Sequence, residues 1–427
     1  MTAPAVNPPP TDWFEARRRA HRAGEAARTP TERVPLDSAL GRVLAQPLIA
    51  LCDVPHAVTS AMDGWAVAGH GPWRLREAAA APGAPGDPGA RAPEAVAPRA
   101  HAAETPALRP GEASPVLTGG VPPAGTDAVL RSELGVLSVN ADGSTSTQLE
   151  TAPHAPAGEP APGRHLRPAA TEAARGEAVL PAGAVLSPIR LALAAACGLD
   201  AIDVVARPPV ALVRTGDEVV DSGIPLPGQV RDSFTLTLPP LLTALGARIG
   251  RQEKAPDDFA ATVAALRAAA DEASLVVTTG GTGRSGADQV REALAALGAE
   301  VIVDGVAVRP GAPTLLAQLP SGALVVALPG NPLAALLSLH TLAHPLLAGL
   351  QGLPLPALGR VLVAEPIAPP GAPLSLRPYR LGPSGAVPTA WHGSAMLRGL
   401  AEADGVLLVP AEGAAVGAQL DTLPAFR

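Results

Sequence analysis

The sequence is poor in lysine and in aromatic side chains. Lys254 is its only lysine, and aromatic residues make up 2% of the 427 residues. Arginine must therefore supply nearly all fixed positive charge; its guanidinium can hold an oxyanion through two parallel hydrogen bonds, but it does not act as a neutral base near pH 7. With so few aromatic residues, we expect a core built mostly from leucine, valine and alanine.

Cysteine is also scarce, and basic charge is not in excess. Cys52 and Cys197 lie far apart and have no metal-ligand spacing, so we expect buried free thiols rather than a disulfide. The formal net charge of −7 argues against a general nucleic-acid binder, which needs a basic surface to release counterions. It leaves room for a local basic pocket that holds one phosphorylated ligand.

Two further patterns are absent. No uninterrupted apolar run of about 20 residues suggests a membrane span, and the N-terminus lacks a charged-then-apolar signal pattern. We therefore expect a cytoplasmic protein without a membrane partner. At roughly 150 residues per domain, the length predicts about three domains.

The N-terminal half reads as one helix followed by short strands and turns. Residues 11–28 form a helical pattern that Thr11 or Asp12 can cap, with Pro30 just beyond its end. Residues 76–115 and 152–163 are rich in alanine, proline or glycine, which predicts loose connections.

From residue 181 onward, continuous Val/Leu/Ile runs alternate with amphipathic helical stretches. This alternation predicts parallel strands covered on both faces, that is, a doubly wound α/β domain. Pro239 and Pro240 do not fit easily, since they fall where a helix should continue; either this helix starts late, with both prolines in its first turn, or it is kinked. After about residue 350, short strands and proline turns predict a small β domain.

Four clusters follow predicted strands of the α/β domain, where such sheets bind ligands. They are Arg214–Glu218, Thr278–Gly283 followed by Asp288, Val308–Pro313 and Leu328–Pro332. Taken singly, each has a simpler explanation: a tight Gly-Gly turn, a solvated Asp-Glu turn, or a helix start. Together they indicate an anionic ligand, because glycines let backbone amides approach phosphate oxygens.

Carboxylates accompany these glycines. Asp217, Glu218 and Asp288 would repel a phosphate unless a cation lay between them, so they suggest Mg²⁺ held partly through water. In the N-terminal half, Ser60–Ala66 (SAMDGWA) and Thr118-Gly119-Gly120 stand out, although both could be ordinary turns.

In this order, the motifs resemble those of the molybdopterin molybdenumtransferase family, to which the C-terminal domain of gephyrin also belongs. Ser60–Ala66 is similar to S-x-M-D-G-[YFW]-A, and Thr118 through Glu133 to T-G-A-x-x-P-x-G-A-D-A-V…E. Further similarities are Thr215–Glu218 to T-G-D-E, Val230–Ser233 to [IV]-R-[DN]-S, Gly280-Gly281 with Asp288 to G-G-x-S-x-G-x-x-D, Arg309–Pro313 to K-P-G-K-P, Leu328–Pro332 to L-P-G-N-P, and Ser394–Leu397 to S-[GS]-M-L.

The resemblance implies an elongated homodimer with four domains per chain. We place an N-terminal helical and linker domain at residues 1–45 and 150–180, a β-rich second domain at 46–149, a molybdopterin-binding-like α/β domain at 181–346, and a C-terminal β domain at 347–427. The implied reaction is Mg²⁺-dependent insertion of molybdate into adenylylated molybdopterin with release of AMP. Its cleft would join the α/β domain of one chain to the second domain of the other.

The resemblance also implies roles for individual residues. The catalytic set is Asp63, Thr118, Glu218, Asp288 and Arg309, and the metal set is Asp217, Glu218 and Asp288. The residues implied in binding the substrate are Thr215, Gly216, Asp217, Asp232, Ser233, Gly280, Gly281, Thr282, Pro310, Gly311, Pro329, Gly330, Asn331 and Pro332.

Several positions depart from the family pattern. Both lysines of K-P-G-K-P are replaced, by Arg309 and Ala312, and the asparagine of N-[IV]-R is His165. The Gly-Gly loop contains Arg284, which could replace lost charge. Three functions remain open: an active molybdenum-inserting enzyme, a degenerate homologue that binds molybdopterin or nucleotide as a carrier or scaffold, and another nucleotidyl or phosphate enzyme. A molybdopterin adenylyltransferase-type protein would be a suitable partner.

Overall fold

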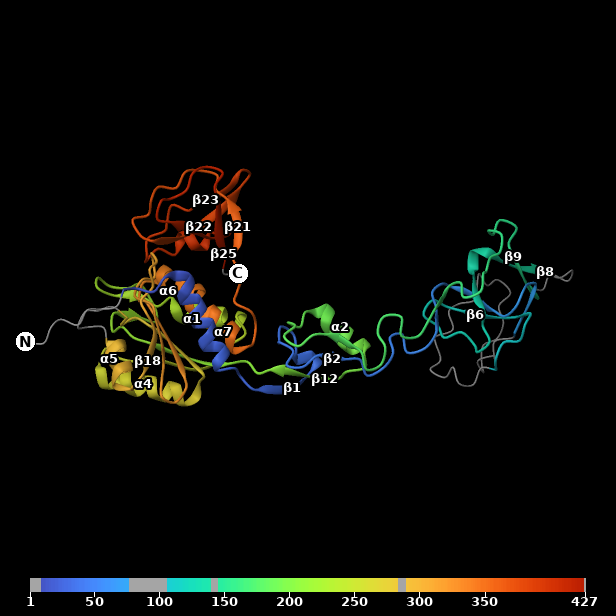
Figure 1. Cartoon of the computed structure of the whole chain (residues 1–427), viewed down its shortest axis with the longest axis horizontal. Helices are drawn as coiled ribbons and strands as arrows, with labels where there is room; N and C mark the ends of the chain where they lie inside the picture. Colours follow the sequence, from blue (N-terminus) through green and yellow to red (C-terminus); the bar gives the residue numbers. More distant parts are fainter. Residues whose placement is uncertain (1–8, 77–105, 140–144, 283–288, 426–427) are drawn as a thin grey trace, which may run out of the picture.

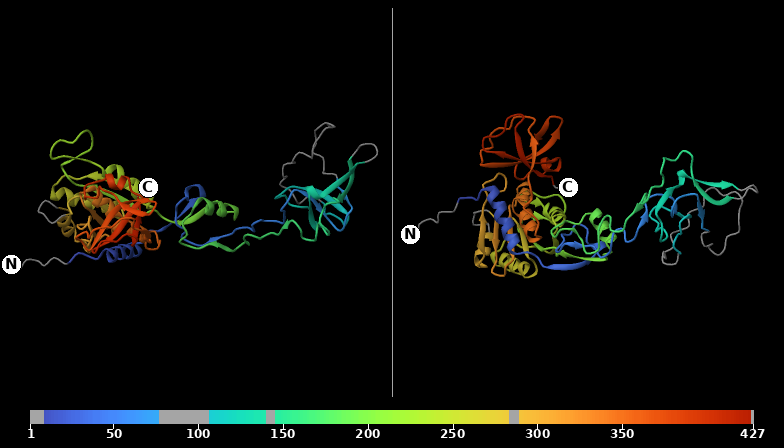
Figure 2. Two further views of the ribbon diagram at one scale, coloured as in Figure 1. Left: turned by 90° about the horizontal axis from the view of Figure 1, so that it is seen from above. Right: turned by 45° about the vertical axis from the view of Figure 1, so that its right-hand side comes forward.

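The computed structural model describes residues 9–76, 106–139, 145–282 and 289–425. These residues form an elongated molecule with four parts (Figures 1 and 2). An α/β domain and the C-terminal β domain lie at one end, a small middle module follows, and a second β domain lies at the other end. Two segments of the chain connect the middle module to the second domain.

A six-stranded sheet forms the α/β domain, in the order β16-β13-β17-β20-β19-β18. The first four strands in this order run parallel, which confirms the expected doubly wound arrangement. The sequence pattern does not predict β19. This strand is antiparallel to both its neighbours, so β18 runs in the same direction as β20. The strands are β13 (Pro209–Arg214), β16 (Arg248–Lys254), β17 (Leu275–Thr279), β18 (Glu300–Asp304), β19 (Leu315–Gln318) and β20 (Leu324–Leu328).

Helices cover both faces of this sheet and bury mostly leucine, valine and alanine, as the composition predicts. One face carries α1 (Trp13–Ala26), α3 (Phe234–Ala244), α6 (Pro332–Ser338), the π-helix η4 (Leu339–Ala343) and α7 (His344–Leu350). The other carries α4 (Phe259–Glu272) and α5 (Gln289–Ala296).

The stretch Pro332–Leu350 is the central helix of the fold. It has 19 residues and, among the described residues, it alone is long and apolar enough to cross a membrane by length and composition. However, 94% of its apolar window is buried inside the molecule, and its leucines belong to the main core. Its apolar character is therefore explained by packing within this domain.

Helix α1 packs on α7 although it begins the chain. Asp12 rather than Thr11 caps it, because its carboxylate accepts the amides of Phe14 and Glu15. A Cβ at Gly24 would lie 2.2 Å from the carbonyl oxygen of Leu346, and one at Gly349 would lie 2.3 Å from that of His21. Glycine on both helices thus lets the two backbones touch.

Helix α3 continues through both prolines. It begins at Phe234, so Pro239 and Pro240 lie in its second turn, and the expectation of a late start is wrong. Each proline lacks the amide hydrogen that would bond four residues back. The hydroxyl group of Thr243 donates to the carbonyl oxygen of Pro239.

The middle module is built from segments distant in the sequence. β1 (Thr31–Pro35) pairs with β12 (Ala201–Val205), and β2 (Leu48–Ile49) pairs with β11 (Ala178–Leu180), both antiparallel. Its core includes Ala194 and Cys197 from the end of α2 (Pro188–Ala196). Both cysteines are free thiols, as expected, but only Cys197 is buried.

The second domain is a six-stranded sheet in the order β7-β4-β6-β5-β9-β8. A short antiparallel pair, β3 with β10, lies where the chain enters and leaves it. β6 falls partly within residues 76–115, so the expected loose loop ends earlier than residue 115. The strands are β3 (Thr59–Ser60), β4 (Gly64–Val67), β5 (Trp73–Leu75), β6 (Glu112–Val116), β7 (Ala128–Arg131), β8 (Gly135–Val139), β9 (Thr145–Thr151) and β10 (Leu166–Arg167).

The expected C-terminal β domain is present. Its five strands have the order β21-β25-β24-β22-β23. They are β21 (Gly359–Leu362), β22 (Leu374–Gly382), β23 (Gly385–Pro388), β24 (Gly405–Pro410) and β25 (Gln419–Pro424), with the short helix α8 (Arg398–Ala401) before β24.

The packing of α1 and α2 differs from the domain boundaries expected from the sequence. We assigned α1 to the N-terminal domain, but its buried residues join the core of the α/β domain. We assigned residues from 181 onward to the α/β domain, but α2 and β12 complete the middle module. The first strand of the α/β sheet is β13, which begins at Pro209.

Candidate functional site

Three of the predicted loops meet at the carboxyl edge of the parallel strands. The Thr215 amide and hydroxyl group both donate to the carbonyl oxygen of Thr279, at 3.1 and 3.0 Å. The Gly280 amide donates to the carbonyl oxygen of Leu328 at 3.1 Å, and a Cβ at Gly330 would lie 3.6 Å from the Cα of Gly280. The loops after β13, β17 and β20 therefore form one continuous surface.

Glycine is required at both positions of the Gly-Gly pair. Gly280 and Gly281 have φ angles of +85° and +60°, values that side chains disfavour. A Cβ at Gly280 would lie 2.8 Å from the Thr215 hydroxyl oxygen, and one at Gly281 would lie 2.9 Å from a methyl carbon of Val290. The pair brings bare backbone to the edge of the sheet, which suits a phosphate ligand.

Asp257, which the motifs did not reveal, holds the Thr215–Glu218 loop. Its two carboxylate oxygens accept the amides of Gly216 and Asp217, each at 3.0 Å. In return, its own amide donates to the Asp217 carboxylate at 3.4 Å. Asp257 follows the carboxyl end of β16, so the rule that located the other clusters could have found it.

The carboxylates at this edge fit a hydrated Mg²⁺ only in part. Asp217 and Glu218 are exposed beside each other, and Mg²⁺ usually takes one or two carboxylates together with waters and substrate phosphates. Within residues 9–76, 106–139, 145–282 and 289–425, however, no group of three or more His, Cys, Asp or Glu side chains is placed to hold a metal. The third predicted ligand, Asp288, lies outside the described residues, and the convergence of all three stays a prediction.

Asp232 is occupied within the fold. Its carboxylate accepts the amides of Phe234 and Thr235 at the start of α3 and forms an ion pair with Arg214. Burial pushes its pKa up, but the hydrogen bonds from Thr235 and Phe234 and the charge of Arg214 outweigh burial and lower the pKa. A ligand role for Asp232 and its neighbour Ser233 stays a prediction, and the observed contacts are structural.

The loop Arg309–Pro313 joins β18 to β19 at the same edge of the sheet. Its backbone is bound to the C-terminal domain, since the Arg309 amide donates to Leu374 and the Leu376 amide donates back to Arg309, both at 2.9 Å. The Arg309 side chain is exposed.

The C-terminal domain also touches the loop Leu328–Pro332. The Asn331 side-chain amide donates to the Ser394 hydroxyl group at 3.3 Å, and the Ala334 amide donates to the Ser394 carbonyl oxygen at 3.1 Å. On the opposite side, the Thr282 carbonyl oxygen accepts from Arg291 at 3.0 Å. The C-terminal domain thus contacts two of the predicted loops, Arg309–Pro313 and Leu328–Pro332.

Asp63 and Thr118 meet in the second domain. The Asp63 carboxylate accepts the amide and the hydroxyl group of Thr118, at 2.7 and 2.8 Å. These two bonds, the backbone bond first, hold the pKa of Asp63 below its usual value. The second domain and the α/β domain lie at opposite ends of the molecule in every view (Figures 1 and 2). Within one chain, Asp63 and Thr118 are therefore far from the loops of the α/β domain.

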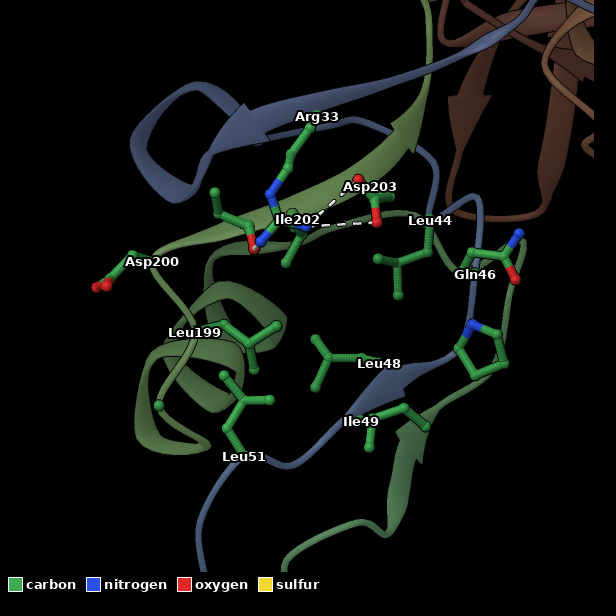
Figure 3. A pocket seen from close by; sticks show the side chains of 13 residues that line it. Arg33, Leu44, Gln46, Leu48, Ile49, Leu51, Leu199, Asp200, Ile202 and Asp203 are labelled. Atoms are coloured by element: carbon green, nitrogen blue, oxygen red, sulfur yellow. Dashed lines mark hydrogen bonds and ion pairs between the residues drawn. The ribbon is translucent and has the colours of Figure 1, made fainter.

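A cavity of about 340 Å³ opens elsewhere, in the middle module. Leucine side chains point into it, and Arg33 reaches Asp203 at its rim, 3.4 Å away (Figure 3). None of the residues predicted for the site lines this cavity. Its largely apolar lining does not suit a phosphate ligand.

Comparisons with known proteins cover nearly the whole chain. Residues 12–198 match the family described as MoeA N-terminal region (domain I and II), and residues 211–349 match the family described as probable molybdopterin binding domain. A molybdopterin molybdenumtransferase of Synechococcus elongatus is 35% identical over 393 residues, with 89% of this chain and 90% of that protein covered. Molybdopterin molybdenumtransferase 2 of Mycobacterium tuberculosis is 32% identical over 88% of this chain and 90% of its own. The chain belongs to the molybdopterin molybdenumtransferase family.

Solved structures agree with this membership. A molybdopterin biosynthesis MoeA protein of Pyrococcus horikoshii aligns with a TM-score of 0.71 and 26% identity, covering 96% of this chain and 99% of that one. The match of residues 12–198 to the family's N-terminal region also includes all of α2. This agrees with the packing of α2 in the middle module.

Two departures from the molybdenumtransferase motifs have a visible structural setting. His165 has a φ angle of +59°, a conformation in which asparagine and histidine are both enriched, and its ring lies 3.1 Å from a carboxylate oxygen of Glu159. Histidine can therefore replace the family's asparagine without changing the turn. Ala312 is exposed in the Arg309 loop, so its missing lysine removes charge and not packing.

Proposed function

We propose that this chain is a molybdopterin molybdenumtransferase, which inserts molybdate into adenylylated molybdopterin and releases AMP. The observation that carries the proposal is the meeting of the Thr215, Gly280 and Gly330 loops at one sheet edge, together with relatives named for this activity. Backbone amides of these glycine loops would hold the phosphates of the substrate.

The carboxyl edge of the sheet carries an exposed arginine on one loop and exposed carboxylates on another. The exposed Arg309 side chain would bind an oxyanion, either molybdate or a substrate phosphate, by charge-assisted hydrogen bonds. On the other loop, Asp217 and Glu218 would hold Mg²⁺, with Asp288 as the expected third ligand. When bound, Mg²⁺ would neutralise the phosphoanhydride charge as that bond breaks and AMP leaves.

We further propose that the enzyme acts as a homodimer. Asp63 and Thr118 lie in a domain remote from the loops of their own chain, so the second domain of a partner chain would have to supply them. The two free thiols are compatible with a cytoplasmic location, which we also propose. An enzyme that adenylylates molybdopterin must supply the substrate, and we propose it as a partner.

The test is AMP release by the purified chain supplied with adenylylated molybdopterin, Mg²⁺ and molybdate. We expect AMP to appear only in the complete mixture and to disappear when the metal is chelated or the substrate is omitted. Binding of the substrate without AMP release would instead support the alternative function, a carrier or scaffold without turnover.

A further inference from the structure

Two buried hydroxyl groups lie beneath the Arg309–Pro313 loop. Thr314 is 0% exposed and Ser338 is 2% exposed, and their hydroxyl oxygens are 2.6 Å apart. The Thr314 hydroxyl group also donates to the Gly311 carbonyl oxygen at 2.7 Å. Thr314 directly precedes β19, and Ser338 is the last residue of α6, so this contact joins separate elements.

The direction of the hydrogen bonds follows from the number of protons. A threonine hydroxyl group has one hydrogen, and here Thr314 gives it to Gly311. Ser338 must then donate to Thr314 in the pair. This makes a short chain of bonds from α6 through Thr314 to the backbone of the loop, where the Thr314 amide also donates to the Gly311 carbonyl oxygen at 3.1 Å. Removing the Thr314 hydroxyl group leaves the buried Ser338 hydroxyl group without this partner.

Gly311 is pressed against the same serine. Its φ angle is +111°, and a Cβ there would lie 2.8 Å from the Ser338 hydroxyl oxygen. Ser338 belongs to the helix that starts directly after Asn331, at Pro332. The pair therefore links two of the predicted ligand loops, one through Gly311 and the other through α6.

We infer that Thr314 and Ser338 are positioning residues for the reaction: they fix the Gly311 backbone, and with it Arg309, relative to the loop Leu328–Pro332. The inference rests on the proposed function, because it assigns the Arg309 loop to oxyanion binding. Neither hydroxyl group would touch the substrate, since both are buried. Their effect would pass entirely through the position of the loop.

The experiment compares Thr314→Val, which keeps the shape and loses the hydroxyl group, with Thr314→Ser, which keeps the hydroxyl group. Thr262→Val is the matched control, because Thr262 is 1% exposed on α4, on the other face of the sheet. Three quantities are measured in the full-length protein: kcat and KM for molybdate during AMP release, the Kd of molybdate by calorimetry, and hydrogen exchange of the amides of residues 309–314.

For Thr314→Val we expect KM and Kd for molybdate to rise about tenfold, with kcat changed less than about threefold and faster exchange across the loop. Thr314→Ser and Thr262→Val should both keep KM, Kd, kcat and the exchange rate of the loop close to their wild-type values. Faster exchange with unchanged molybdate affinity would reduce the pair to a structural role and overturn the inference. If the wild-type chain releases no AMP, the proposed function fails, while Kd and exchange still decide this inference.

Discussion

The carboxylate of Asp63 accepts two hydrogen bonds from Thr118, one from its amide and one from its hydroxyl group. Because these bonds lower the pKa of Asp63, the carboxylate stays ionised to a lower pH than an ordinary aspartate. Thr118→Val removes the hydroxyl bond and keeps the amide bond, so the pKa should rise part of the way to its usual value. An NMR titration of the carboxyl carbon measures it, and Thr126→Val in the same domain is the control; no change in Thr118→Val would contradict the assignment.

A site shared between two chains predicts rescue by mixing. Asp63→Asn and Asp288→Asn should each be inactive as homodimers, but a mixed population should regain part of the AMP release through hybrid dimers in which one cleft is intact. Differently tagged chains allow the hybrids to be isolated. If isolated hybrids are as inactive as the parents, the cleft does not cross the interface.

Asp257 and Asp258 are neighbours with different tasks. Asp257 holds two amides of the Gly216-Asp217 turn, whereas Asp258 caps α4 through the Ala261 amide. Asp257→Asn keeps one oxygen acceptor and replaces the other by an NH2 donor, so AMP release should slow about tenfold or more, because one charge-assisted bond is lost and the other is weakened. Asp258→Asn, a good cap itself, should stay close to wild type in turnover. Equal activity of the two variants would remove Asp257 from the site.

Arg309 carries the charge that two lysines share in the family motif. Arg309→Ala should weaken molybdate or phosphate use about ten- to a hundredfold and leave the fold intact, as expected for losing a charge-assisted hydrogen bond. Ala312→Lys should raise activity if the missing charge is a defect. The rival is Arg284, outside the described residues: if it has taken over the charge, Arg284→Ala is as harmful and Ala312→Lys brings no gain. Unchanged oxyanion dependence in both arginine variants would show that neither serves the site.

Two histidines of the central helix predict acid sensitivity. Burial, then the charges of His344 and Arg17, lower the pKa of His340 to about 3, and burial and Arg17 lower that of His344 to about 4. Below the ordinary value of 6.5, the unfolded chain takes up protons that the folded chain refuses. The free energy of unfolding should therefore fall as the pH drops from 6.5 toward 4, by at most about 1.4 kcal/mol per pH unit for each histidine.

Denaturant titrations between pH 7 and pH 4.5 measure this slope. His340→Gln should make it shallower by about one proton, while His56→Gln, an exposed histidine, should leave it unchanged. An identical slope in His340→Gln would show that this histidine is not the source. If the variant is too unstable for denaturant titration, the number of protons that the wild-type chain takes up on unfolding measures the same slope.

The candidate site was predictable to the extent that it follows strand ends. The parallel strands and the glycine loops are visible in the sequence because continuous apolar runs and Gly-Gly pairs are local signals. Asp257 also follows a strand end, but its role in holding the Gly216-Asp217 turn, 41 and 40 residues away, is visible only in the structure. The burial of the Asp232 carboxylate against Arg214 likewise depends on tertiary packing.

The places of α1 and α2 could not be derived from their own patterns. Both are ordinary helices with an apolar side, and such a side does not say which core it joins. The partner of α1 is fixed by the fit of Gly24 against Leu346 and of Gly349 against His21. Contacts of this kind join residues more than 300 positions apart, and only the three-dimensional structure shows them.

The two segments that lead to and from the second domain pair with each other, β2 with β11 and β3 with β10. Ser60 on the way out therefore lies opposite Leu166 on the way back. The bridge between Val54 and Ala173 lies between these two pairs, and the pairing of β2 with β11 contains a register shift, so the two segments run side by side with their pairing fixed at several points. Shortening one of them alone would shift its pairing by a residue and reverse which side chains face inward. A change in the reach of the second domain therefore calls for changes in both segments, because its entry and exit are held side by side.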